Sequence, residues 1–135
     1  MFVSALQLIQ HGGRRVPVSL VQDKVFQLED IALLDFEDGS GPCRNGTSAV
    51  NTVVRGVVPR GAYTGLSFVI GVPFARNHGD PTLAPPPLSS TAMFWTWQGG
   101  YKFIRFDAGL AGVAPASPPM GHGRTRSAIV RTNSG

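Results

Sequence analysis

The first side chain suited to chemistry is the imidazole of His78, in the stretch NHGDP (77–81). Neutral imidazole is the commonest metal ligand among protein side chains, and Asn77 and Asp80 lie close enough in sequence to orient the ring by hydrogen bonds. The same stretch is also typical of a plain turn, because Asn, Gly, Asp and Pro each favour turns. His78 is therefore a candidate metal ligand, and a structural turn is the alternative.

The second candidate is the aromatic stretch MFWTWQGGYKFIRFD (93–107), which contains both tryptophans of the chain. If residues 93–98 form a strand, Trp95 and Trp97 face the same side, since successive side chains of a strand alternate. Three interpretations stay open: core packing, a platform on which a sugar stacks, or an oxidisable pair near a metal.

No catalytic motif accompanies these residues. The chain contains no nucleophile elbow, no phosphate-binding loop, no HExxH zinc motif and no dinucleotide fingerprint. We therefore predict that the protein is not itself an enzyme.

Charge and hydropathy exclude further classes. The formal net charge is +4, yet residues 1–107 carry nine Lys and Arg against eight Asp and Glu, so the main body is nearly neutral. A neutral body offers no basic patch for phosphates, and we predict no nucleic-acid partner. No apolar run approaches the roughly 20 residues of a membrane helix. Residues 1–10 lack the basic region and cleavage site of a signal peptide, so we predict neither a membrane span nor a signal peptide.

The elements that must position these residues have the pattern of strands. Residues 63–72 alternate large apolar side chains with small or polar ones, and residues 48–58 alternate similarly across a Pro- and Gly-rich turn, which predicts a hairpin. Residues 1–10 and 16–21 flank a second turn, and residues 31–36 form a short apolar run. We therefore predict an all-β fold, an antiparallel β-sandwich or a barrel, without amphipathic helices.

Two stretches differ from this pattern. Residues 75–90 include four prolines and predict a long loop, in which three consecutive prolines favour polyproline II geometry. Residues 108–135 are rich in Ala, Gly, Pro, Ser and Arg and contain no aromatic residue. We predict a domain over residues 1–107 and a disordered tail over 108–135.

Three motifs in order along the chain resemble a known family. LLDFEDGSGPCRNGT, VRGVVPRGAYTGLSFVIGVPFARNHGDP and PLSSTAMFWTWQGGYKFIRFD are similar to stretches of the MbnP-like copper-binding proteins, also described as the four-Cys-motif members of metallo-mystery pair systems. The resemblance runs over about residues 1–107.

The resemblance implies an exported, typically periplasmic β-sandwich that binds copper. Its implied partner is a di-haem enzyme related to cytochrome c peroxidases, which oxidises a tryptophan of the protein to kynurenine, and the product binds copper. Residue by residue, the family histidine corresponds to His78 and the family tryptophans to Trp95 and Trp97. Imidazole suits copper in either oxidation state.

The chain also departs from the family pattern. Of four expected cysteines only Cys43 is present, and its implied disulfide partner would precede Met1. A family segment with a histidine, a plausible second copper ligand, and further cysteines is replaced here by the Arg- and Ser-rich tail. The resemblance therefore implies an incomplete antiparallel β-sandwich, in a chain truncated at both ends with an out-of-frame tail. The alternative from a different functional class is an aromatic-faced β module that binds a carbohydrate or a peptide.

Overall fold

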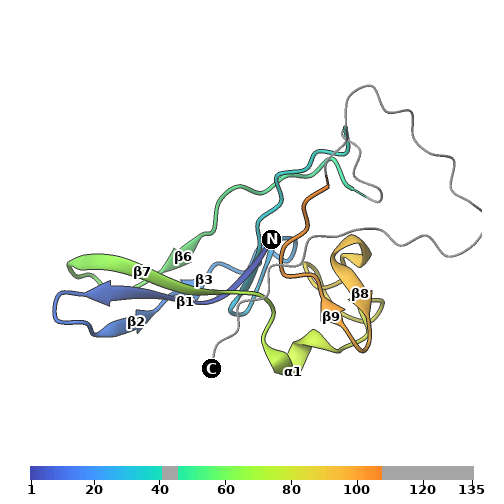
Figure 1. The fold of residues 1–135 in the computed structure, drawn as a ribbon. Helices are drawn as coiled ribbons and strands as arrows, with labels where there is room; N and C mark the ends of the chain where they lie inside the picture. The colour runs from blue at the N-terminus through green and yellow to red at the C-terminus, as the bar shows by residue number, and fades with distance from the viewer. Residues whose placement is uncertain (41–45, 108–135) are drawn as a thin grey trace, which may run out of the picture.

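The computed structural model describes residues 1–40 and 46–107 of the chain (Figure 1). Strands predominate in this part, and its helical elements span no more than one turn each, which confirms the predicted all-β class. The predicted disordered tail, 108–135, and Cys43 lie outside the described residues. The elements, in chain order, are β1 (Phe2–Gln10), β2 (Arg15–Pro17), β3 (Ser19–Leu20), β4 (Gln27–Leu28), β5 (Ile31–Leu33), β6 (Gly56–Val57), β7 (Tyr63–Ile70), α1 (Phe74–Asn77), η1 (Thr91–Met93), β8 (Phe94–Thr96) and β9 (Gly100–Tyr101).

The largest sheet is built around β1. This strand pairs antiparallel with β7, β5 and β2, and β4 is added beyond β5. Because Val3 and Gln7 each pair with β7 and with a second strand, β5 and β2 share the edge of β1 opposite β7. The register between β1 and β7 shifts after Ser4, at a bulge where Ala5 has a φ of 50°. The outer strands of this sheet are therefore β7 on one side and β2 and β4 on the other.

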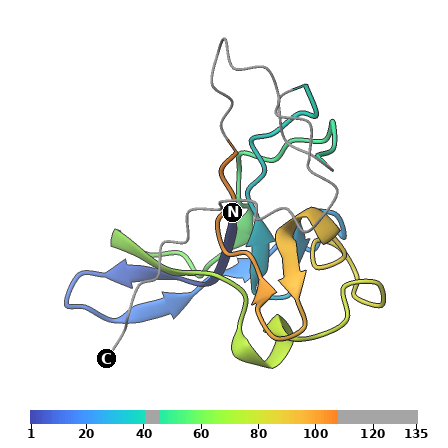
Figure 2. The ribbon, with the colours of Figure 1, turned by 45° about the vertical axis from the view of Figure 1, so that its right-hand side comes forward.

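Two short ribbons accompany this sheet. One joins β3 to β6, and the other is the β8–β9 hairpin. Both views of the ribbon show β1, β2 and β7 drawn out to one side, with α1 next to β8 and β9 on the other (Figures 1 and 2). The described residues form one sheet with two ribbons, so a second full sheet that would complete a sandwich is not among them.

The core consists of two apolar clusters joined through β1. Phe2 belongs to the larger cluster and Val3 to the smaller one, because neighbouring side chains of a strand point to opposite faces. The larger cluster binds the sheet to the β8–β9 hairpin: the ring of Tyr101 contacts that of Phe2 edge-on, with centroids 5.5 Å apart. The remaining buried members of the larger cluster are Ile31, Leu33, Val72, Leu88 and Met93.

The predicted hairpin between residues 48–58 and 63–72 is wrong. β7 pairs with β1, and β6 pairs with β3. Of residues 48–58, the strand pairing is limited to Gly56, Val57 and an isolated bridge from Asn51 to Asp35. The long alternating strand β1 offers β7 a partner of nearly equal length, and this non-local pairing prevails over the nearer segment. The β1–β2 hairpin, by contrast, forms as predicted.

The predicted loop over residues 75–90 is confirmed, with two corrections. It begins inside the single helical turn α1, and the three prolines do not extend as polyproline II. The Pro86–Pro87 peptide is cis, and the chain turns there, with the N–H of Leu88 donating to the carbonyl of Pro85 at 3.0 Å. The turn directs Leu88 into the core, where it is 3% exposed.

No helix in the described part of the chain is long and apolar enough to cross a membrane.

Candidate functional site

His78 directly follows α1, and the residue that fixes its position is Asn77. The side chain of Asn77 is buried, and its Oδ1 accepts a hydrogen bond of 2.9 Å from the backbone N–H of Tyr101 in β9. The hairpin approaches so closely that a Cβ on Gly100 would lie 2.5 Å from the carbonyl oxygen of Asn77. Gly100 also has a φ of +69°, a conformation that favours glycine. Asn77 and Gly100 therefore hold the end of α1 against the hairpin that carries the tryptophans.

The imidazole of His78 bonds to the backbone of Trp97. Its Nδ1 lies 2.9 Å from the carbonyl oxygen of Trp97. A carbonyl oxygen only accepts, so Nδ1 carries the proton and donates. In the neutral ring the lone pair then resides on Nε2, the arrangement found in many metal-binding histidines.

Nε2 of His78 has a polar neighbour. Nδ2 of Asn77 lies 3.4 Å away, a long and weak contact for a hydrogen bond. Since Oδ1 of Asn77 is held by Tyr101, the amide group keeps its N–H donors toward the imidazole. The ring of Phe74 lies edge-on to the imidazole of His78, with centroids 5.3 Å apart. The imidazole is thus oriented by its neighbours while His78 remains exposed.

Both tryptophan rings reach the surface. Trp95 is 47% exposed and Trp97 is 71% exposed, so neither is a core residue, and the core-packing interpretation is wrong. The ammonium group of Lys102 lies 5.5 Å from the centroid of the Trp95 ring, within cation–π range. The two rings therefore have different electrostatic surroundings on one hairpin.

Asp80, the second predicted orienting residue, is bonded elsewhere. Its Oδ1 accepts from the side-chain hydroxyl of Thr82 at 2.7 Å and from the backbone N–H of Thr82 at 2.8 Å. These hydrogen bonds, the one from the hydroxyl above all, lower the pKa of Asp80. Asp80 thus shapes the turn after His78, as the turn interpretation of NHGDP expects, and the structure gives it no hydrogen bond to the imidazole.

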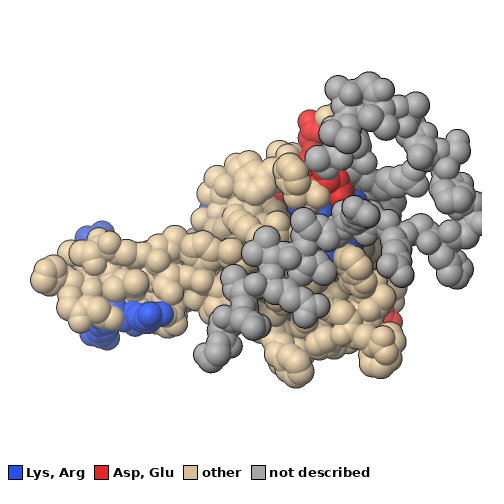
Figure 3. Space-filling model, viewed as in Figure 1, with Lys and Arg blue, Asp and Glu red and all other residues tan. Residues whose placement is uncertain are grey.

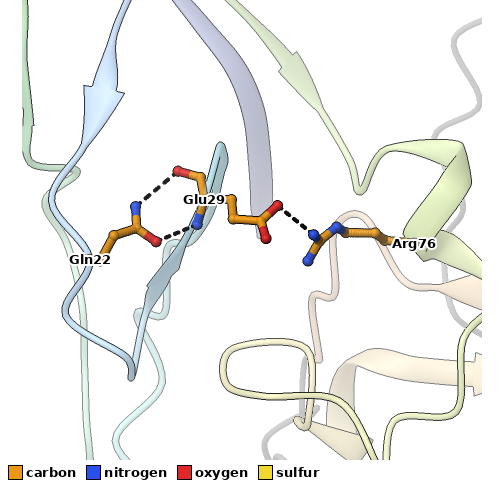
Figure 4. A network of polar contacts seen from close by, with 3 residues as sticks. All are labelled: Gln22, Glu29 and Arg76. Atoms are coloured by element: carbon orange, nitrogen blue, oxygen red, sulfur yellow. Dashed lines mark hydrogen bonds and ion pairs between the residues drawn. The ribbon is translucent and has the colours of Figure 1, made fainter.

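A polar network that the sequence did not reveal ties α1 to the sheet (Figure 4). Arg76 of α1 forms an ion pair with the carboxylate of Glu29 in the β4–β5 turn. The side-chain amide of Gln22 bonds to both backbone groups of Glu29: Oε1 accepts from the N–H, and Nε2 donates to the carbonyl at 3.0 Å. These two hydrogen bonds hold Glu29 at a φ of 52°. Residues this far apart in sequence carry no shared motif, so only the folded chain brings them together.

Within the described residues, the candidate ligand His78 has no cluster of further metal-ligating side chains around it. No group of three or more His, Cys, Asp or Glu side chains gathers among these residues in a geometry that could hold a metal ion. The donor chemistry fits a copper ion at a single position, the Nε2 lone pair of His78.

Fold and site together define a small all-β protein with an exposed histidine–tryptophan pair. The family model of MbnP matches residues 1–122, past the predicted domain boundary at residue 107. Among solved structures, MbnP from Methylosinus trichosporium is similar, with 38% sequence identity and a TM-score of 0.63. No curated protein matches the chain.

The chain belongs to the MbnP family, which confirms the resemblance of its motifs. The structural match covers 78% of this chain and 40% of the Methylosinus trichosporium protein. The present chain thus corresponds to less than half the length of that relative.

Proposed function

We propose that this chain is a copper-binding protein of the periplasmic type, and that a di-haem enzyme related to cytochrome c peroxidases oxidises one of its tryptophans to kynurenine. The observation that carries the proposal is the 2.9 Å contact between Nδ1 of His78 and the carbonyl of Trp97. It joins a candidate copper ligand directly to a residue that can be oxidised.

The role of His78 is to offer Nε2 to copper. Because Nδ1 donates to a carbonyl, the neutral ring is held in the tautomer whose lone pair is on Nε2, where Nδ2 of Asn77 makes only a long contact of 3.4 Å. Asn77 accepts from the backbone N–H of Tyr101 and so fixes the chain next to His78, and copper at Nε2 would replace the weak contact with Nδ2 of Asn77. Kynurenine carries an aryl amine and a ketone, so the modification would add donor atoms where the described residues offer one ligand.

Trp97 is the better candidate for the oxidation. Removal of an electron from an indole leaves a positive charge on the ring, and a nearby ammonium group opposes that charge. Lys102 lies 5.5 Å from the ring of Trp95, whereas Trp97 is the more exposed of the two. We therefore assign the kynurenine to residue 97.

In this proposal the chain is a substrate and not an enzyme. Conversion to kynurenine breaks the C2–C3 bond of the indole, and water supplies the oxygen atoms. Electrons leave to the haem groups of the partner, protons leave to solvent, and the excised carbon leaves as formate. The net change replaces one carbon atom of the residue by one oxygen atom.

Co-expression with the di-haem partner tests the oxidation. Peptide mass spectrometry should find the kynurenine mass on residue 97 in the wild type and in Trp95→Phe, and no kynurenine in Trp97→Phe. Kynurenine on residue 95 alone would overturn the assignment to Trp97. Two intact rings in the wild type would overturn the oxidation itself.

A second candidate function rests on the exposure of the same rings. Trp95 and Trp97 on one hairpin are also suited to stack on a sugar or to grip a peptide. A screen of oligosaccharides and peptides by tryptophan fluorescence distinguishes the two. Saturable quenching that disappears in Trp97→Phe, together with no copper binding, would favour the binding module.

A further inference from the structure

The near-neutral charge of the main body is an average over two unlike parts. The eight Asp and Glu of the chain lie in residues 23–38 and at Asp80 and Asp107. Residues 1–22 and 39–79 contain none, and they include β1, β2 and β7 in full. The arm that these three strands form therefore has no acidic side chain of its own, and each basic side chain on it adds to one positive field.

Three arginines lie at the outer end of this arm, and we call them the arginine tip: Arg14, Arg15 and Arg60. Arg14 and Arg15 close the β1–β2 turn, and Arg60 lies in the loop before β7. This loop packs against the end of β1, where a Cβ on Gly61 would lie 3.2 Å from Nε2 of Gln10. All three arginines are exposed. On the face shown in Figure 3, Lys and Arg gather at the far end of the arm, and no Asp or Glu is seen along it.

No carboxylate of the described residues pairs with the arginine tip. The guanidinium group of Arg15 donates to the neutral hydroxyl of Ser67 at 3.2 Å and keeps its charge. Residues 41–45 and 108–135, outside the described part, contain four arginines and no Asp or Glu. Side chains of these segments therefore cannot neutralise the tip, and its charge is left for an anionic partner.

The chemistry of the tip favours phosphate groups on a lipid surface. Guanidinium groups bind phosphate oxygens through paired hydrogen bonds. Each basic side chain near an anionic bilayer adds to the attraction without requiring a matched shape. Protein interfaces are instead centred on buried aromatic anchors, and single-stranded nucleic acids stack on exposed rings. The turn at residues 11–15 and the loop at residues 58–62 contain no Phe, Tyr or Trp that could serve either purpose.

We propose that the arginine tip docks this protein on an anionic lipid bilayer, where Arg14, Arg15 and Arg60 bind the phosphates of the headgroups. The arm is drawn out to one side of the molecule, and α1 lies next to β8 and β9 on the other (Figures 1 and 2). A protein docked through the tip therefore presents His78 and the tryptophan hairpin away from the bilayer. This inference does not depend on copper or on the oxidation.

Co-sedimentation of the full chain with lipid vesicles tests the proposal. The wild type should bind vesicles made of equal parts phosphatidylglycerol and phosphatidylcholine, and should not bind vesicles of phosphatidylcholine alone. Because salt screens exposed charges, the bound fraction should fall as the NaCl concentration rises. The double variant Arg14→Gln/Arg60→Gln leaves the hydrogen bond of Arg15 in place and should weaken binding to the anionic vesicles by at least about fivefold.

The matched control is Lys24→Gln/Arg55→Gln, which removes the same net charge from two exposed side chains outside the tip. The arginines of residues 108–135 are the same in both variants, and the control should bind within about twofold of wild type. Equal weakening by the two variants would overturn the proposal, because total charge would then explain the binding. So would equal binding to both kinds of vesicle. Failure to bind the anionic vesicles would overturn it too, whether or not the wild type binds a single-stranded oligonucleotide.

Discussion

At the scale of single residues, the site depends on which nitrogen of His78 carries the proton. The contact with the carbonyl of Trp97 decides this, because a carbonyl cannot donate. Asn77 contributes a second constraint through its bond to Tyr101. The candidate ligand is therefore oriented before any metal arrives, which reduces the ordering cost of binding.

Substitution of the candidate ligand gives the first prediction. His78→Ala removes the Nε2 lone pair and should lower Cu(I) affinity by more than about tenfold. Competition with a chromogenic chelator measures the change. His11→Ala is the control, since His11 is exposed in the β1–β2 turn, far from α1 in the fold. Equal affinity of wild type and His78→Ala would remove His78 from the copper site.

At the scale of elements, the close approach of β9 to α1 is the feature that builds the site. Gly100→Ala should destabilise the fold by at least about 2 kcal/mol, because the new methyl group meets the backbone of Asn77 and the left-handed φ disfavours alanine. Thermal unfolding measures this loss.

Gly79→Ala provides the matched control for that substitution. Gly79 lies next to His78, and its nearest neighbour to a new Cβ is the carbonyl oxygen of Arg76 at 3.8 Å, an ordinary contact. We expect a change within about 0.5 kcal/mol. Similar losses in both variants would mean that the approach of Gly100 to Asn77 has no special role.

The loop before β4 has its own stabilising residue, Asp23. Partial burial of its carboxylate opposes ionisation, but hydrogen bonds from the backbone N–H groups of Val25, Gln27 and Phe26 outweigh that effect and lower its pKa below 3.8. A carboxylate with a lowered folded pKa stabilises the fold above its unfolded pKa, and the contribution is lost as the pH falls through the folded value.

Asp23→Asn should therefore lower the melting temperature at neutral pH, because a neutral amide oxygen accepts these N–H groups more weakly than a carboxylate does. The difference from wild type should shrink as the pH falls below 3.8 and through the lower folded pKa of Asp23, because the wild-type carboxylate is then neutralised as well. Asp30→Asn is the control, because exposed Asp30 accepts no hydrogen bond from another described residue. A pH-independent difference at Asp23 would contradict the electrostatic explanation.

At the scale of the whole molecule, the two core clusters share β1 and β5. Phe2 and Ile31 enter the larger cluster, while the adjacent Val3 and Ala32 enter the smaller one. Neither cluster can lose its packing without displacing the same two strands, so we expect one cooperative unfolding transition. Far-ultraviolet circular dichroism and tryptophan fluorescence should give coincident melting curves. A separate early transition in fluorescence would show that the β8–β9 hairpin unfolds on its own.

Local patterns predicted the strand content, the β1–β2 hairpin and the exposed turn that carries His78. They failed where distant segments compete for the same partner: β7 pairs with β1 and not with residues 48–58. Gln27 shows the same limit within the core. Its buried amide bonds to the carbonyls of Val21 and Arg55 at 2.6 and 2.8 Å, and no periodicity distinguishes such a glutamine from an exposed one.

Local patterns had the same limit at the candidate site. Residue types singled out His78, Trp95 and Trp97, but nothing in the spacing of NHGDP foretold that the imidazole would bond to a backbone atom nineteen residues away. The prediction that Asp80 orients the imidazole gained no support, because its carboxylate instead bonds to Thr82, two residues away in the sequence. Sequence-local chemistry was predictable, and chemistry between elements required the fold.

The acceptor of the His78 hydrogen bond is main chain, and every amino acid offers the same carbonyl oxygen at that position. A substitution of Trp97 that keeps the backbone in place therefore leaves the tautomer of His78 unchanged. Selection can therefore act on the ring and on the histidine separately, although the two are neighbours in space. Variation at position 97 would then reflect requirements on the ring itself and none that come from the imidazole.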